Sequence, residues 1–248
     1  MIFPGQGSQH VGMLAELAAA HPLVTDTFAE ASTALGYDLW QLAQHGPAEE
    51  LALTHITQPL VLTGSVAIWR LWREQGGAAP AFLAGHSLGE YSALVAAEAL
   101  AFADAVTLVE QRGKFMQSAV PVGTGSMVAI IGLDDEAVAA ACQSASTATE
   151  VVAAVTFNSP GQVVISGQVA AVERAIEACK AAGAKRALPF PVSAPFHSPL
   201  MRPAAERFAA ILEQVAIQAP KIAVLHNVGI EPCADPALIR QKLVTQIY

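Results

Sequence analysis

The sequence predicts an α/β fold, in which a larger α/β core is interrupted by a smaller α+β insertion. Short apolar segments bounded by turn residues alternate along the chain with segments of helical periodicity. Between residues 127 and 192 the expected segments follow the order strand, helix, strand, strand, helix, strand. The chain has 248 residues, of which 53% are hydrophobic and 14% charged, so it can bury a sizeable core.

The expected core elements begin with a short strand that ends at Phe3 and leads into the glycine-rich turn 5–9. The apolar run at 81–84, bounded by proline and glycine, predicts a buried strand. Helical spacing of apolar side chains predicts helices through about residue 34, over 59–75, directly after Ser87, and over 102–119.

The insertion is expected to be ferredoxin-like. Strands are predicted at 127–131, 151–157, 163–166 and 186–192, and helices from Asp134 and over 169–182. The sequence Asn-Ser-Pro-Gly at 158–161 is typical of a turn between two strands. The resulting order βαββαβ matches the ferredoxin-like unit.

A return to the core is expected at Ser198 and Pro199, a favoured pair for a helix N-cap and first helical position. We therefore assign residues 1–122 and 199–248 to the core and 123–198 to the insertion.

Charge and composition exclude several classes of protein. The net charge of −8 argues against nucleic acid as the main partner, because phosphate binding requires clustered Lys and Arg. No apolar run approaches the roughly 20 residues of a membrane-spanning helix, and the N-terminus lacks a signal-peptide pattern. The three cysteines show no spacing typical of a disulfide framework or zinc site. We expect a cytoplasmic protein without a bound metal.

The motif Gly85-His86-Ser87-Leu88-Gly89 fits G-x-S-x-G and lies between an expected strand and an expected helix. In such a turn the serine is strained and exposed, and the flanking glycines let neighbouring backbone approach closely. The Leu88 amide would lie at a helix N-terminus, where the dipole favours an oxyanion. The context predicts a nucleophilic Ser87 in a hydrolase-like α/β core, against the alternative of a chance glycine-serine turn.

A nucleophilic serine needs a base, and seven histidines are available. His197 lies where a strand ends and a capped helix begins, a position at which catalytic groups often occur. His226 follows the apolar run 222–225 and is the second candidate, with the alternative that it is a satisfied histidine at a strand end. No acid for a Ser-Asp-His order is evident between Ser87 and either base, which weakens an esterase interpretation.

Several motifs occur in order along the whole chain: 3–9 (Phe-Pro-Gly-Gln-Gly-Ser-Gln), 85–91 (Gly-His-Ser-Leu-Gly-Glu-Tyr), 111–113 (Gln-Arg-Gly), 157–162 (Phe-Asn-Ser-Pro-Gly-Gln) and 195–198 (Pro-Phe-His-Ser). Together they resemble the acyltransferase family of fatty-acid and polyketide synthesis, which includes the malonyl-CoA:acyl carrier protein transacylases. This set of motifs in register is far more specific than G-x-S-x-G alone. Family members usually carry a few more residues before the first strand and continue well beyond Tyr248, so the resemblance also implies that both ends of this chain are trimmed.

The resemblance implies a role for each matched residue. Ser87 would be the nucleophile and His197 its base, with the backbone amides of Gln6 and Leu88 as the oxyanion hole. Arg112 would bind the substrate carboxylate, Asn158 would lie near the site, and Gln246 would match the position that orients the histidine. Without the resemblance, Arg112 would be interpreted as a solvated helix arginine near Glu110, Gln6 as turn filler, and Gln246 as a helix-end residue.

The function implied is malonyl transfer from malonyl-CoA to the phosphopantetheine thiol of acyl carrier protein, an S-malonyltransferase activity of fatty-acid synthesis that uses no cofactor. Alternatives are a serine thioesterase or esterase, an extender-unit acyltransferase of polyketide synthesis, and a non-catalytic fragment that binds carrier protein. We expect a monomer without nucleic-acid or membrane partners. Because acyl carrier proteins are acidic, we expect a basic docking patch formed by Lys180, Lys185, Arg186, Arg202 and Arg207.

Overall fold

The computed structural model describes residues 1–192 and 194–248 and divides into two compact units. We call residues 1–114 with 208–246 the core unit, and residues 115–207 with 247–248 the inserted unit. The boundaries expected from the sequence, near 123 and 198, fall in loops. Those of the compact units fall inside helices α7 (Phe102–Gln117) and α10 (Arg202–Leu212).

The core unit contains a parallel sheet in the order β1-β2-β7. Its strands are β1 (Ile2–Phe3), β2 (Phe82–Gly85) and β7 (Ala223–Leu225). Helix α6 (Gly89–Ala96) packs on β1 and β2. The strands predicted at Phe3 and at 81–84 are confirmed, and with them the α/β class.

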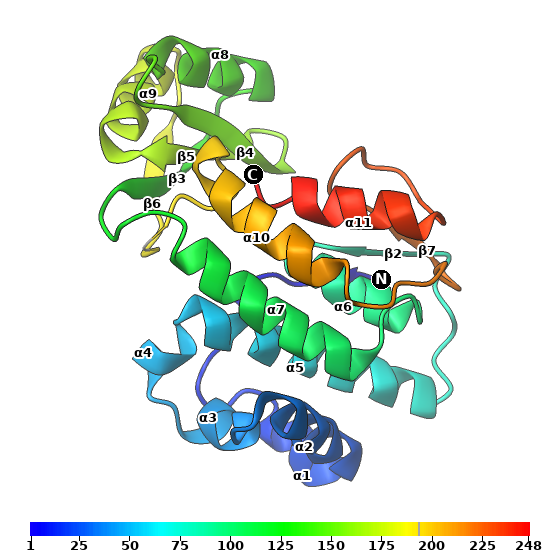
Figure 1. Cartoon of the computed structure of the whole chain (residues 1–248). Helices are drawn as coiled ribbons and strands as arrows, with labels where there is room; N and C mark the ends of the chain where they lie inside the picture. Colours follow the sequence, from blue (N-terminus) through cyan, green and yellow to red (C-terminus); the bar gives the residue numbers. More distant parts are fainter. Residues whose placement is uncertain (193) are drawn as a thin grey trace. The chain divides into compact units, whose positions relative to one another are not determined.

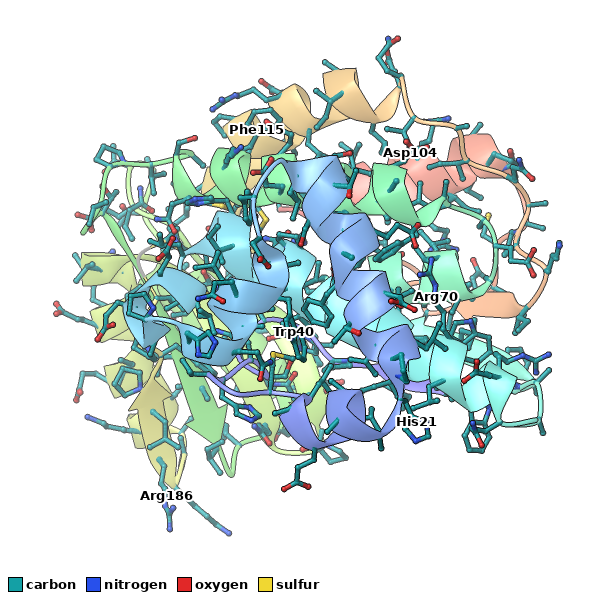
Figure 2. All side chains as sticks on the ribbon, turned by 90° about the horizontal axis from the view of Figure 1, so that it is seen from below. His21, Trp40, Arg70, Asp104, Phe115 and Arg186 are labelled. Carbon is teal, nitrogen blue, oxygen red and sulfur yellow. The ribbon has the colours of Figure 1, made fainter. Side chains whose placement is uncertain are left out.

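Helices make up most of the core unit (Figure 1). In addition to α6, α7 and α10, they are α1 (Ala15–Ala20), α2 (Pro22–Leu35), α3 (Leu39–His45), α4 (Ala48–Leu51), α5 (Thr54–Glu74) and α11 (Pro236–Thr245). Phe28 of α2 meets Trp40 of α3, labelled in Figure 2, edge to face at a ring-centroid distance of 4.8 Å. This contact anchors a helix that the apolar pattern did not predict.

The predicted start of the second long helix at Pro59 is wrong, because α5 begins at Thr54 and Pro59 lies inside it. The first five residues of α5 include Thr54, Thr57 and Gln58, which are polar but buried. Since the apolar periodicity begins only after these residues, the pattern placed the helix start too late.

The inserted unit is built on an antiparallel sheet in the order β4-β5-β3-β6. Its strands are β3 (Gly125–Ile131), β4 (Val152–Ser159), β5 (Gln162–Gln168) and β6 (Arg186–Pro189), and its helices are α8 (Asp135–Ala145) and α9 (Val169–Ala181). Both helices cover one face of the sheet (Figure 1) and bury apolar side chains that include Val138, Ile130, Val163, Ile165 and Val172. The order along the chain is the predicted βαββαβ.

Two helices of the inserted unit begin at the N-cap residues that the sequence predicts. Asp134 caps α8, with Oδ1 accepting a hydrogen bond from the Ala137 amide at 2.8 Å. Ser198 is the N-cap residue of a short 3-10 helix, η1 (Pro199–Met201), with proline at its first position, but its hydroxyl donates to the Pro195 carbonyl oxygen at 2.7 Å instead of accepting from a helix amide. Strand β6 ends at Pro189, earlier than the predicted residue 192.

Candidate active site

The core unit brings three loops together at one edge of its sheet. Gln6 follows β1, Ser87 and Leu88 follow β2, and His226 and Asn227 follow β7. Because the three strands are parallel neighbours, their carboxyl ends meet at the same edge. Open α/β sheets bind ligands outside the carboxyl ends of their strands, so this edge is the candidate site.

The turn around Ser87 requires glycine on both sides. A Cβ on Gly85 would lie 1.9 Å from the Gly89 carbonyl carbon, and a Cβ on Gly89 would lie 2.3 Å from the Phe3 oxygen. Ser87 itself has φ of 51°, in the left-handed region that non-glycine residues rarely adopt. The predicted strained turn between strand and helix is therefore confirmed, and it projects a serine at the site.

The loop after β1 lies directly against this turn. A Cβ on Gly5 would be 2.6 Å from the His86 carbonyl oxygen, so Gln6 follows a point of backbone contact. Leu88 is the N-cap residue of α6, at the end of the helix whose dipole favours negative charge. This arrangement supports the amides of Gln6 and Leu88 as oxyanion donors, a role that stays a prediction.

Arg112 is buried, at 1% exposure, which contradicts its interpretation as a solvated helix arginine. Its Nη1 donates to Gln58 Oε1 at 2.8 Å, and its Nη2 donates to Ser87 Oγ at 3.1 Å and Gln246 Oε1 at 2.9 Å. The expected neighbour Glu110 pairs with Lys114 instead, at 2.9 Å.

Among the described residues, the buried guanidinium of Arg112 has hydrogen bonds to the neutral side chains of Gln58, Ser87 and Gln246. Within residues 1–192 and 194–248, no carboxylate lies at ion-pair distance from it. Burial lowers the pKa of Arg112, although Tyr91 and Glu90 nearby oppose this effect. Because arginine remains protonated in proteins, the site holds a positive charge that favours an anion.

Gln246 joins the serine turn to Arg112. Besides accepting from Arg112, its Nε2 donates to the Ser87 carbonyl oxygen at 3.0 Å and to Glu90 Oε2 at 2.7 Å. The resemblance implied only a role in orienting His197, and that role stays a prediction. The structure adds direct contacts of the Gln246 side chain with the nucleophile's turn.

Sequence reasoning missed a buried polar network beneath the serine turn. Glu90 Oε1 lies 2.6 Å from His226 Nδ1, and both side chains are 0% exposed. Glu90 Oε2 accepts a hydrogen bond from the Asn227 amide at 3.1 Å. The prediction that His226 lies at a strand end is confirmed, whereas its hydrogen bonds are satisfied at Nδ1 alone, because the buried Nε2 has no hydrogen-bond partner among the described residues. The position of His226 and Asn227 after an apolar strand was the available signal.

His197 and Asn158 belong to the inserted unit. His197 lies in the loop before η1 and has φ of 62°, a strained conformation of the kind that recurs at functional sites. Asn158 lies near the end of β4. The pairing of His197 with Ser87 and the role of Asn158 stay predictions.

The five residues of the expected basic patch also belong to the inserted unit. Lys180 pairs with Glu177 at 2.8 Å. Arg202 lies over the Tyr248 ring and Arg207 over the Phe115 ring, at 4.4 and 4.2 Å from the ring centroids. Lys185 and Arg186 are exposed around the start of β6, and the Arg186 side chain extends away from the ribbon in Figure 2. The patch as a docking surface stays a prediction.

The described residues also bear on metal binding and on membrane insertion. No group of three or more His, Cys, Asp or Glu side chains there could hold a metal ion. None of the helices formed by those residues is both long and apolar enough to cross a membrane.

Known proteins share a family model and high sequence identity with this chain. Residues 1–244 match the family model described as acyl transferase domain. The malonyl CoA-acyl carrier protein transacylase of Salmonella typhimurium is 63% identical over 247 residues, covering 100% of this chain and 80% of that protein.

Two solved structures have similar folds and match this chain over its whole length. A malonyl-transacylase solved in complex with its type II polyketide acyl-carrier protein has a TM-score of 0.98 and 57% identity, over 100% of this chain and 80% of that chain. An acyl carrier protein S-malonyltransferase from Vibrio cholerae has a TM-score of 0.97 and 58% identity over the same shares. The chain therefore belongs to the acyl transferase domain family.

Proposed function

We propose that this chain transfers a malonyl group from malonyl-CoA to the phosphopantetheine thiol of an acyl carrier protein, through an acyl-enzyme on Ser87. The observation that carries the proposal is the position of Arg112. Its buried guanidinium, without a carboxylate partner in the described chain, donates to Ser87 Oγ at 3.1 Å. A cation beside the nucleophile suits an acyl group that ends in a carboxylate.

In the proposed reaction, His197 takes the proton of Ser87 as Oγ attacks the thioester carbon. The amides of Gln6 and Leu88 hold the oxyanion of the tetrahedral intermediate. The carbon–sulfur bond then breaks, and coenzyme A leaves with the proton from His197. The thiol of the carrier protein attacks the acyl-enzyme in the reverse sequence, and Ser87 regains its proton. These steps require no metal ion and no redox cofactor.

The remaining residues would support this chemistry. Gln246 would orient His197 in place of the acid that the sequence lacks, and Asn158 would lie near the bound substrate. The solved relative in complex with a type II polyketide carrier protein supports an acyl carrier protein as partner. We place the reaction in fatty-acid synthesis, with polyketide synthesis as the second pathway. We also propose that the enzyme is a cytoplasmic monomer.

The Arg112 assignment can be tested by the choice of acyl group. Arg112→Ala should lose transition-state stabilisation for malonyl of about 2–5 kcal/mol, because the carboxylate is left without its cation. Uncharged acetyl should be tolerated relatively better. Arg112→Lys should not restore malonyl transfer, since an ammonium lacks the planar fork that binds two carboxylate oxygens. The measurement is kcat/KM for malonyl-CoA and acetyl-CoA with carrier protein.

Arg174→Ala is a suitable control, because Arg174 is an exposed arginine of the inserted unit that pairs with Glu150 at 2.7 Å. Its malonyl/acetyl preference should equal that of the wild type. An unchanged preference in Arg112→Ala would contradict the assignment of the carboxylate site.

A further inference from the structure

The side chain of Asn227 bridges the two ends of the serine turn. Its Nδ2 donates to the Gly85 carbonyl oxygen at 2.7 Å, and its Oδ1 accepts from the Ser87 amide at 2.8 Å. The orientation of the amide is fixed by these partners, since a carbonyl only accepts and an N–H only donates. One side chain thus spans the segment that sets the conformation of Ser87.

Asn227 is in turn held by the buried network. Its backbone amide donates to Glu90 Oε2 at 3.1 Å, and Glu90 is fixed by His226 Nδ1 at 2.6 Å and Gln246 Nε2 at 2.7 Å. The side chains of Glu90 and His226 are 0% exposed, so water does not compete for these contacts. The anchor of Asn227 is therefore rigid, although Asn227 itself is exposed.

Ser87 needs such a restraint because its backbone is strained. A φ of 51° is unfavourable for a residue with a Cβ, and it persists only where the surroundings enforce it. The two hydrogen bonds from Asn227 act on the residues that flank His86, directly across the turn. Loss of both would let the turn relax and move Ser87 Oγ.

We propose that Asn227 is a positioning residue, which holds the Ser87 turn in its reactive conformation by joining Gly85 to Ser87. The inference rests on the proposed function, because it concerns the same nucleophile. Asn227 acts through the backbone of Ser87 and through no contact with the acyl group. Its loss should therefore lower the rate of acylation and leave substrate affinity unchanged.

The test is single-turnover acylation by malonyl-CoA, followed by intact mass. Asn227→Ala should lower the maximal acylation rate at least about 10-fold, since small displacements of reacting groups are costly. The malonyl-CoA concentration that gives half of its maximal rate should stay within about twofold of wild type, because the substitution does not change the binding of malonyl-CoA. Asn227→Asp, which keeps an acceptor for the Ser87 amide, should lie between wild type and Asn227→Ala.

Gln168→Ala is a matched control from the inserted unit. The Gln168 side chain bridges the same kind of groups, accepting from the Val151 amide at 2.6 Å and donating to the Thr149 carbonyl at 3.1 Å. Removing this bridge should leave the acylation rate unchanged.

The outcomes separate this inference from the proposed function. A wild-type enzyme that gains no malonyl group would overturn the proposed function itself. If wild type is acylated and folded Asn227→Ala matches its rate, or loses activity only through weaker binding, the positioning role is wrong. Should Asn227→Ala fail to fold, Asn227→Asp decides: a reduced maximal rate supports the role, and a wild-type rate overturns it.

Discussion

At the scale of single residues, His226 and His197 have different roles in this account. His226 is buried against Glu90, whereas His197 lies in a strained loop of the inserted unit. Removing His226 leaves Glu90 Oε1 buried without its hydrogen-bond partner. Serine acylation, in contrast, requires a base that can reach Ser87 Oγ.

His226→Ala should therefore lower the free energy of unfolding by about 1–3 kcal/mol, because Glu90 Oε1 loses its hydrogen-bond partner while Oε2 keeps those from Asn227 and Gln246. The protein that remains folded should still be acylated, with a smaller loss of rate than in His197→Ala. His197→Ala should keep its stability and lose acylation. Urea unfolding and single-turnover acylation measure the two effects. Equal losses of acylation rate in the two folded variants would remove the basis for choosing His197.

Residues differ in how far their roles can be predicted from the sequence. Ser87 was predictable because its motif encodes a local turn, which depends on Gly85 and Gly89 in the same segment. The burial of Arg112 was not predictable from the sequence, because most of its sequence neighbours are polar. Arg112 is buried only by the packing of its helix, α7. Asn227 lies 140 residues from Ser87 and belongs to no local motif, so its contact depends on the pairing of β7 with β2.

At the scale of elements, strands with apolar runs were predictable, as was α8 with its Asp134 cap, whereas the short helix α3 and the start of α5 were not. The start of α5 was placed too late because Thr54, Thr57 and Gln58 are buried without being apolar. One of these residues, Gln58, contacts Arg112. Polar residues that serve the site thus interrupted the periodicity from which the element was predicted.

The region around the start of β6 gives a prediction at this scale. Lys185 and Arg186 are exposed there, and charges at the rim of an interface mainly affect association rate and salt dependence. Lys185→Glu with Arg186→Glu should raise the Michaelis constant for carrier protein at low salt, less so at high salt. Acylation by malonyl-CoA should be unchanged.

Arg73→Glu with Lys221→Glu is the matched control, because it changes net charge equally through exposed residues of the core unit. If the β6 double variant matches wild type at low salt, or if the control shows the same defect, the docking surface lies elsewhere.

At the scale of the whole molecule, the two units contribute different parts of the proposed site. The core unit holds the nucleophile, the buried cation and the network that joins them, and each is described by direct contacts. The inserted unit holds His197, Asn158 and the basic residues. The acyl transferase domain model matches residues 1–244 and so includes segments of both units.

The central claim is that Ser87 carries malonyl between coenzyme A and a carrier protein. Its most direct test is the intact mass of the enzyme after mixing with malonyl-CoA, before and after addition of holo acyl carrier protein. Wild type should gain the mass of one malonyl group, keep it in buffer, and lose it to the carrier protein. Ser87→Ala should fold and gain nothing. A malonyl adduct on Ser87→Ala, or a wild-type adduct released equally fast without carrier protein, would contradict the account.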